Sequence, residues 1–363
     1  MDKKETMKQE TTRTTLNKLL RFLFGEVFSK LAEISIGDRI LLLTHTDLDG
    51  SGPAVLLRVF FPDLVVRHCS NACMDREIEN TLTDPETGEK YDAVIICDIS
   101  CKLETAERID GNMTVKKVVL LDHHVTAMDL NRFDWAVVRP EVIEASNFER
   151  RKLKHSSGTS LLYNYLEYVG LIETLPDRCW KTAEDFAFLV AGYDTWDWVK
   201  VFGEDYRFHE MQTVFEQYGM AMFEKVYIDK LKYGFLLISD NEDLLLEIAE
   251  SKKQSYIDSL NISSGSVDMP DGRPYTFDYV QTDRYFGDVY AKLKEVNPEA
   301  DFYILDYGKG VSLRTDKEGI NLGALVKPLG GGGHPGAAGI RISSDLRLRI
   351  LQEVFQTPTF KLN

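Results

Sequence analysis

Three short apolar runs, each followed at once by aspartate or histidine, constrain this chain more than any other feature. They occupy residues 39–44, 93–97 and 118–121. A short unbroken apolar run with turn or polar residues behind it indicates a buried strand. Helical stretches lie between the runs, and this alternation is typical of α/β folds. Because open α/β sheets bind ligands beyond the carboxyl ends of their strands, the residues that follow the runs are candidates for a site.

Aspartate and histidine gather behind the three runs. The candidates are His45, Asp47 and Asp49 after the first run, Asp98 after the second, and Asp122, His123 and His124 after the third. We expect Asp47 and Asp49 to alternate along an extended segment and to point to the same side. Helix capping is the structural alternative for a single aspartate such as Asp98. Carboxylates with imidazoles suit Mn²⁺ or Mg²⁺, and two such ions close together form a centre that cleaves phosphoesters.

Composition limits the compartment and the substrates. The 363 residues include 43 Lys and Arg against 58 Asp and Glu, a formal net charge of −15. This balance argues against a groove for long nucleic acid, because such binding depends on neutralising many phosphates. Five cysteines without a disulfide pattern fit a reducing cytoplasm, and we favour buried thiols over a zinc site for the pairs Cys69/Cys73 and Cys97/Cys101. No apolar stretch reaches membrane-spanning length, so we expect a soluble cytoplasmic protein without a membrane partner.

The pattern along the chain predicts two α/β domains, the first with a mostly parallel sheet and the second smaller, with an active-site cleft between them. The divisions are a tail and helix at 1–38, a catalytic domain at 39–240, a helical linker at 241–260 and a substrate-binding domain at 261–363. An apolar stripe from Leu16 to Leu31 predicts a packing face on the first helix and is compatible with a homodimer. Strands are expected near 64–69, 275–281, 301–306 and 310–314, and helices near 52–60, 102–109, 157–170, 180–191, 208–233 and 286–295.

A glycine run before a histidine marks the C-terminal domain. The candidates for substrate binding are Gly331, Gly332, Gly333 and His334, together with Ser312 and Arg314 on a preceding strand. Consecutive glycines allow backbone N–H groups to approach a phosphate or base closely. Ser312 and Arg314 alternate with apolar neighbours, so both are expected to face one groove, where Arg314 would clamp a phosphate. A glycine-rich turn that packs two strands explains the run equally well from the residues alone.

The order of these motifs resembles the DHH phosphoesterase superfamily. The matching features are HxDxDG at His45–Gly50, Asp98 at a strand end, Asp122-His123-His124, Asp194 at the end of an apolar helix, and a tail at 330–339 like that of the DHH-associated C-terminal domain. They span roughly residues 39–340. Within the superfamily the chain looks most like the small cytoplasmic oligoribonuclease (nanoRNase) type. In many relatives the first histidine stands four residues before the aspartate, whereas His45 stands two before Asp47.

The resemblance implies a site with two Mn²⁺ ions, or Mg²⁺ in their place. One ion would be bound by His45, Asp47 and Asp98, and the other by Asp49, Asp98, His123 and Asp194. Asp122 would orient its neighbours, and His124 would contact the scissile phosphate or assist the leaving oxygen. The implied reaction is hydrolysis of oligoribonucleotides of about two to five nucleotides to nucleoside 5′-monophosphates, by a water that the two ions activate.

Other functions stay open. The same site would suit linear or cyclic dinucleotides, or 3′-phosphoadenosine 5′-phosphate. An exonuclease of the RecJ type is less favoured because the chain lacks a basic groove signature and an OB-fold, and a pyrophosphatase is disfavoured because the HxxxDxD form is absent. A nucleotide or metal sensor is the non-enzymatic alternative. Several residues are expected to be structural. Trp196, Trp198 and Phe186 are expected in the core, with a base-stacking platform as the alternative, and Asp197 in a turn. His68 and His209 are expected to be ordinary histidines, and His155 is expected to be structural, with contact to the substrate as the alternative.

Overall fold

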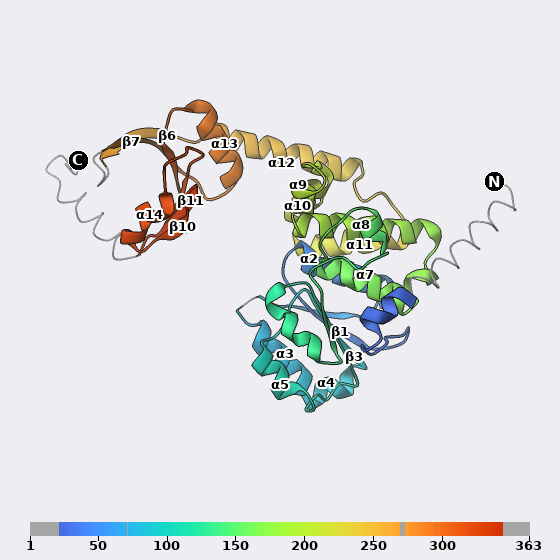
Figure 1. Ribbon diagram of the computed structural model, residues 1–363. Helices are drawn as coiled ribbons and strands as arrows, with labels where there is room; N and C mark the ends of the chain where they lie inside the picture. The colour runs from blue at the N-terminus through green and yellow to red at the C-terminus, as the bar shows by residue number, and fades with distance from the viewer. Residues whose placement is uncertain (1–21, 71, 269–272, 344–363) are drawn as a thin grey trace, which may run out of the picture. The chain divides into compact units, whose positions relative to one another are not determined.

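The computed structural model describes residues 22–70, 72–268 and 273–343 and divides into two compact units, Met1–Leu246 and Glu247–Asn363 (Figure 1). The boundary lies within helix α12 (Asp240–Asp258), where the sequence predicts a helical linker. Residues 22–28 are helical, and Phe24 and Phe28 among them are fully buried. The predicted packing residues Leu16, Leu19 and Leu20 lie outside the described residues.

A five-stranded parallel sheet in the order β2-β1-β3-β4-β5 forms the centre of the first unit. Its strands are β1 (Ile40–Thr44), β2 (Val65–His68), β3 (Ala93–Cys97), β4 (Lys117–Asp122) and β5 (Ala136–Val138). The three apolar runs are the three central strands, and β1 and β3 are buried throughout. The prediction of a mostly parallel sheet is therefore confirmed, whereas the short edge strand β5 was not expected.

Helices cover both faces of this sheet. Alternate side chains of one strand enter different cores: Leu42 and Ile95 pack in the first, Leu41 and Val94 in the second. The first core contains residues of α2 (Leu48–Phe60), α7 (Gly158–Tyr168), α8 (Asp177–Asp194), α10 (Tyr206–Tyr218) and α11 (Met220–Tyr233). The second core contains residues of α3 (Met74–Thr83), α5 (Leu103–Ile109) and the 3₁₀ helix η1 (Val125–Arg132). The remaining short helices of this unit are α4 (Pro85–Lys90), α6 (Asn147–Arg150), η2 (Ile172–Thr174) and α9 (Asp197–Lys200).

Two helix predictions need correction. The helix expected at 208–233 is two helices, α10 and α11, because Gly219 between them adopts a positive φ of 68°. Helix α2 begins at Leu48, because the Asp47 carboxylate caps it by accepting a hydrogen bond from the Gly50 amide at 2.9 Å. Asp49 therefore lies in the first helical turn, and the expectation that Asp47 and Asp49 alternate along an extended segment is wrong.

The second unit contains a six-stranded mixed sheet in the order β10-β11-β9-β8-β7-β6. Its elements are β6 (Ile262–Asp268), β7 (Pro274–Gln281), α13 (Phe286–Val296), β8 (Phe302–Asp306), β9 (Gly310–Arg314), α14 (Leu322–Val326), η3 (Lys327–Leu329), β10 (Gly332–His334) and β11 (Ala337–Arg341). Only β7 and β8 run parallel. Part of the glycine run is thus an edge strand and not a turn.

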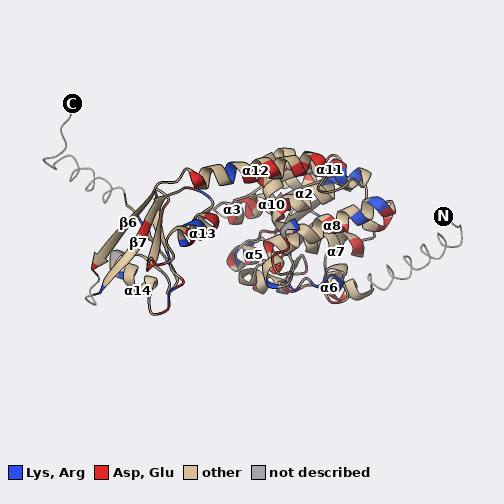
Figure 2. Ribbon diagram, turned by 90° about the horizontal axis from the view of Figure 1, so that it is seen from above, with Lys and Arg blue, Asp and Glu red and all other residues tan. Residues whose placement is uncertain are grey.

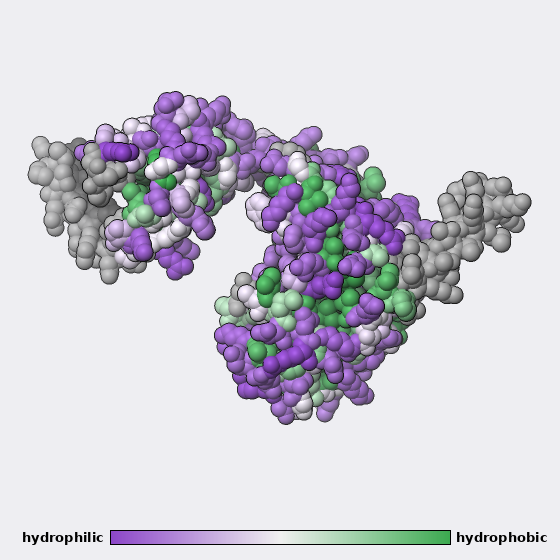
Figure 3. Space-filling view, in the orientation of Figure 1, coloured by the Kyte–Doolittle hydropathy of each residue, from purple (hydrophilic) through white to green (hydrophobic). Residues whose placement is uncertain are grey.

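The surfaces of both units are largely polar. Lys and Arg lie interspersed among Asp and Glu on the helices (Figure 2), and apolar side chains of the first unit appear as separate patches (Figure 3). Within the described residues, no helix is both long enough and apolar enough to cross a membrane.

Candidate metal centre

The loop after β1 brings His45 and Asp47 together. His45 Nδ1 lies 2.6 Å from Asp47 Oδ2, and the two side chains join Asp98 in a group whose ligand atoms all lie within 4.8 Å of one another. The loop turns back tightly onto α2. A Cβ atom at Gly50 would lie 2.4 Å from the His45 carbonyl oxygen, so glycine is required at this close approach.

His68 binds the His45 carbonyl group and is itself supported by Glu224. His68, at the end of β2, donates from Nδ1 to the His45 oxygen at 2.7 Å, and its Nε2 lies 2.8 Å from Glu224 of α11. Glu224 is buried and also pairs with Arg58 at 3.2 Å. His68 was expected to be an ordinary histidine, but the structure places it directly behind the loop.

Asp49 sits at the N-terminus of α7. Its carboxylate accepts hydrogen bonds from the amides of Gly158 at 2.6 Å and Thr159 at 3.0 Å, and its side chain is fully buried. The positive end of the helix dipole favours a carboxylate there. Ser157 caps the same helix in a capping box with Ser160. The helix start at 157 was predicted, but its role in holding Asp49 was not.

Asp98 directly follows β3 in a left-handed conformation with φ 61°. Such a conformation is strained for an aspartate and is maintained only by its surroundings. Its amide donates to the Leu121 carbonyl at 3.0 Å, and Gly158 leaves room beside it, since a Cβ there would lie 2.6 Å from the Asp98 Cβ. The N-cap residue of α5 is Lys102. The capping alternative for Asp98 is therefore excluded.

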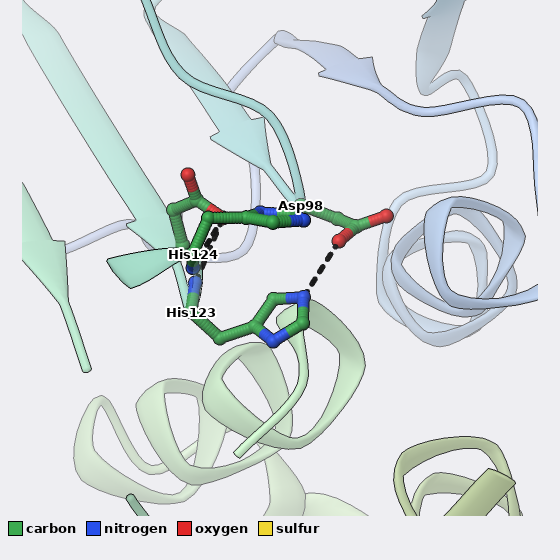
Figure 4. A group of neighbouring side chains, drawn as sticks. Asp98, His123 and His124 are labelled. Carbon is green, nitrogen blue, oxygen red and sulfur yellow. Dashed lines mark hydrogen bonds and ion pairs between the residues drawn. The ribbon is translucent and has the colours of Figure 1, made fainter. Parts of the chain in front are cut away.

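His123 lies between three carboxylates, and Figure 4 shows its ring directed at one of them, that of Asp98. Its Nε2 is 3.2 Å from Asp98 Oδ1, 3.5 Å from Asp194 Oδ2 and 3.8 Å from Asp49 Oδ2. Asp194 is the last residue of α8, so four separate chain segments converge. Burial lowers the pKa of His123, which favours the neutral imidazole that binds metals.

Asp122 organises the turn after β4. Its buried Oδ1 accepts hydrogen bonds from the His123 amide at 2.7 Å and from His124 Nδ1 at 2.7 Å. The bond to Asp122 raises the pKa of His124 and directs the other ring nitrogen away from Asp122. The His124 side chain is about half exposed (53%) and lines the pocket described below.

The donor set fits divalent cations. Burial, followed by the negative charges of Asp49 and Asp47, raises the pKa values of Asp98 and Asp194 well above their usual range. Buried carboxylates that repel one another in this way need a counter-charge. Mn²⁺ and Mg²⁺ prefer such oxygen-rich sites. The structure brings together all six predicted ligands, His45, Asp47, Asp49, Asp98, His123 and Asp194, and their coordination of an ion stays a prediction.

A pocket of about 400 Å³ opens beside this centre within the first unit. His45, Asp47, Asp98, His124 and Asp194 line one part of it. The loop 99–103 and η1 supply the rest, with buried Ile99 and Leu130 among the lining residues. Lys102 is the one Lys or Arg of the described lining; the residue is exposed, and none of the described ion pairs includes it.

Four of the six C-terminal candidates share one face of the second sheet. Ser312 pairs with Gly339, which pairs with Gly332, and Arg314 pairs with Ala337, which pairs with His334. Paired residues point to the same side of a sheet, so Ser312, Arg314, Gly332 and His334 lie on a common face. Gly333 lies between Gly332 and His334 on the strand and therefore belongs to the opposite face of the sheet, and Gly331 lies just before β10. A Cβ at Gly333 would lie 2.4 Å from the Ala337 carbonyl oxygen.

The residues expected to be structural give one correction. Asp197 is fully buried and accepts hydrogen bonds from the amides of Lys154 and His155 and from His155 Nδ1, so it is a satisfied structural residue as predicted. Phe186 is in the core. Trp196 is 60% exposed, and its prediction as a core residue is wrong.

Comparisons with known proteins agree with this geometry. Residues 292–357 match the DHHA1 domain. Over 320 residues the chain is 27% identical to the oligoribonuclease NrnB of Bacillus subtilis (strain 168), a match that covers 87% of this chain and 76% of the relative.

Solved structures are more distant. RecJ from Thermus thermophilus in complex with Mn²⁺ aligns with a TM-score of 0.42 and 13% identity, covering 94% of this chain and 55% of that one. The pGpG-specific phosphodiesterase PggH from Vibrio cholerae aligns with a TM-score of 0.42 and 13% identity, covering 87% and 97%.

The motif order, the DHHA1 match and the similarity to NrnB along most of the chain lead to one conclusion. The chain resembles the DHH phosphoesterases, a superfamily of hydrolytic enzymes, and its residues 292–357 match the DHHA1 domain.

Proposed function

We propose that this protein is a cytoplasmic metal-dependent phosphodiesterase that hydrolyses short oligoribonucleotides to nucleoside 5′-monophosphates. The observation that carries the proposal is the convergence of three ligand groups at the carboxyl ends of β1, β3 and β4. The similarity to an oligoribonuclease supports the choice of substrate.

Each residue of the centre has a role in the proposed reaction. Two Mn²⁺ ions held by the six candidate ligands would activate water and neutralise charge on the phosphate. His124, fixed through Nδ1 by Asp122, presents Nε2 for a hydrogen bond to the scissile phosphate or a proton for the leaving oxygen. Its raised pKa keeps a larger fraction of the ring protonated near neutral pH.

The second unit would contribute to substrate binding. Ser312, Arg314 and His334 share a face with Gly332, whose lack of a side chain would let a phosphate or base approach the backbone. A short oligomer requires few such contacts, which agrees with a net charge of −15.

The test is a Mn²⁺-supplemented digestion of 5′-labelled RNAs of two, three, five and twenty-four nucleotides, with pApA and 3′-phosphoadenosine 5′-phosphate in parallel. We expect rapid loss of the shortest RNAs while the longest persists. Equal or faster attack on the longest RNA would favour a RecJ-like exonuclease, and cleavage of the small phosphoester alone would reassign the substrate.

Asp98→Asn is the matching variant, and Asp63→Asn in the exposed α2–β2 loop is its control. Asp98 belongs to two of the three ligand groups, so its loss should abolish turnover. Without metal, Asp98→Asn should unfold at a temperature no lower than that of the native protein without metal, because the substitution removes one negative charge from a cluster of carboxylates that repel one another. Near-native turnover of Asp98→Asn would contradict the two-metal assignment.

A further inference from the structure

Trp196 combines three properties that the fold does not require of a tryptophan. It lies two residues after Asp194, it is 60% exposed, and its backbone is left-handed with φ 61° and ψ 14°. A bulky side chain rarely adopts this conformation, which glycine or asparagine would adopt with less strain. The chain reversal between α8 and α9 therefore explains the backbone conformation but not the choice of residue.

The surroundings hold the strained segment firmly. The Trp196 amide donates to the Tyr193 carbonyl at 3.1 Å, and the Thr195 hydroxyl donates to the Ala191 carbonyl at 2.8 Å. Immediately beyond, the fully buried Asp197 carboxylate accepts hydrogen bonds from the His155 amide and ring. Strain maintained in this way at a surface residue beside a reactive centre is characteristic of functional positions.

An aromatic cluster supports the exposed indole from behind. The Trp196 ring centroid lies 6.3 Å from that of half-buried Trp198, which in turn stacks on Tyr193 at 6.2 Å with an interplanar angle of 16°. His209 lies 5.8 Å from Trp198. Trp196 is thus the exposed end of a supported cluster, with the rest of its ring available to another flat group.

We propose that Trp196 is a stacking platform for a nucleobase of the substrate. Two residues of chain span at most about 7 Å, so the Trp196 backbone lies near Asp194, and an indole is long enough to meet a group bound beside that carboxylate. In a nucleotide the base is separated from its phosphate by one ribose, which is a similar separation. Aromatic side chains bind unpaired bases by stacking, largely without regard to sequence. The inference rests on the proposed function and adds the group that would recognise a base near the scissile phosphate.

The test compares Trp196→Asn, which removes the ring and suits the left-handed backbone, with Trp196→Tyr, which keeps an aromatic ring. The control is Tyr233→Asn, at the end of α11, whose side chain is equally exposed at 60%. In kinetics on pApA with Mn²⁺, Trp196→Asn should raise KM roughly tenfold with a smaller change in kcat, because stacking contributes mainly to binding. Trp196→Tyr should restore most of the affinity, and Tyr233→Asn should leave KM unchanged.

Abasic dinucleotides identify the base that is bound. One substrate lacks the 5′ base and the other lacks the 3′ base. On the substrate that lacks the stacked base, Trp196→Asn and the native protein should have the same KM. Equal sensitivity of pApA and both abasic substrates to the substitution would overturn the proposal.

A binding assay separates this inference from the catalytic one. Calorimetry should show that the native protein with Mn²⁺ binds AMP more tightly than ribose 5-phosphate, and that Trp196→Asn loses this preference. If the native protein prefers AMP to ribose 5-phosphate but does not hydrolyse pApA, the stacking inference stands and only the proposed function fails. A lowered unfolding temperature of Trp196→Asn together with an unchanged AMP preference would show that the indole is merely structural.

Discussion

Substitution of Gly158 by alanine tests whether the centre depends on the spacing between α7 and β3. An added Cβ would lie 2.6 Å from the Asp98 Cβ and 2.9 Å from its Cα. Carbon atoms normally approach to about 3.5–4.0 Å, so the two backbones must separate by about 1 Å. Overpacking of this kind costs about 1–3 kcal/mol, and the higher helix propensity of alanine offsets at most about 1 kcal/mol.

The displacement falls on two candidate ligands at once. Asp98 is pushed directly, and Asp49 follows because the Gly158 amide binds its carboxylate at 2.6 Å. Metal–ligand distances tolerate changes of about 0.2 Å. We therefore expect the Mn²⁺ concentration for half-maximal activity to rise about 10–100-fold, the range found when groups that orient metal ligands are removed.

The assay is a Mn²⁺ titration of thymidine 5′-monophosphate p-nitrophenyl ester hydrolysis, with thermal unfolding of the metal-free protein in parallel. Gly287→Ala is the control, because a Cβ built at Gly287 of α13 has no neighbour within 4 Å beyond the adjacent residues and the backbone of its own helix. This control should keep its Mn²⁺ dependence and lose no stability. A destabilised Gly158→Ala protein with unchanged Mn²⁺ dependence would refute the reasoning.

Three further predictions concern single side chains. Burial, followed by the charge of Glu184, raises the pKa of Glu167 to about 8 from an ordinary 4.5. The contribution of protonated Glu167 to the free energy of unfolding is therefore fully present at low pH and is lost as the pH rises through 8. In chemical denaturation, Glu167→Gln should be more stable than the native protein by on the order of a few kcal/mol at pH 9 but not at pH 4. His68→Gln cannot bridge the His45 carbonyl and Glu224 as the imidazole does, so a Mn²⁺ titration should show roughly tenfold weaker activation. Lys102→Gln removes the positive charge of the Lys102 side chain from the pocket lining. Steady-state kinetics should show KM for pApA raised roughly tenfold at low salt, and by less at high salt because salt screens the attraction to a phosphate.

The strands that carry the centre were predictable because they are buried on both faces. Such strands read as unbroken apolar runs, and their ends locate Asp98 and Asp122 directly. The second sheet was predicted only in part. Strand β6 exposes most of its residues and has no apolar run, and β10 consists of glycine and histidine.

The errors at the site arise where distant residues determine local structure. A capping bond from Asp47 moves Asp49 into a helix, where the amides of α7 bind it. His68 acts through the His45 carbonyl and through Glu224, which lies 156 residues away, so no local motif reveals it. The aromatic residues after Asp194 suggested a core, but hydrophobicity alone does not show which of them faces solvent.

The wide separation of the candidate ligands along the chain has a consequence for the lifetime of the protein. They come from four segments between residues 45 and 194. Ions bound there would cross-link the chain, and the entropy of closing such long loops rises only slowly with their length. At one hundred times its dissociation constant, an ion that binds only the folded form stabilises it by about 2.7 kcal/mol. Scarcity of manganese would then act twice, by stopping turnover and by exposing the unfolded chain to proteolysis, so the abundance of the protein should follow the metal supply.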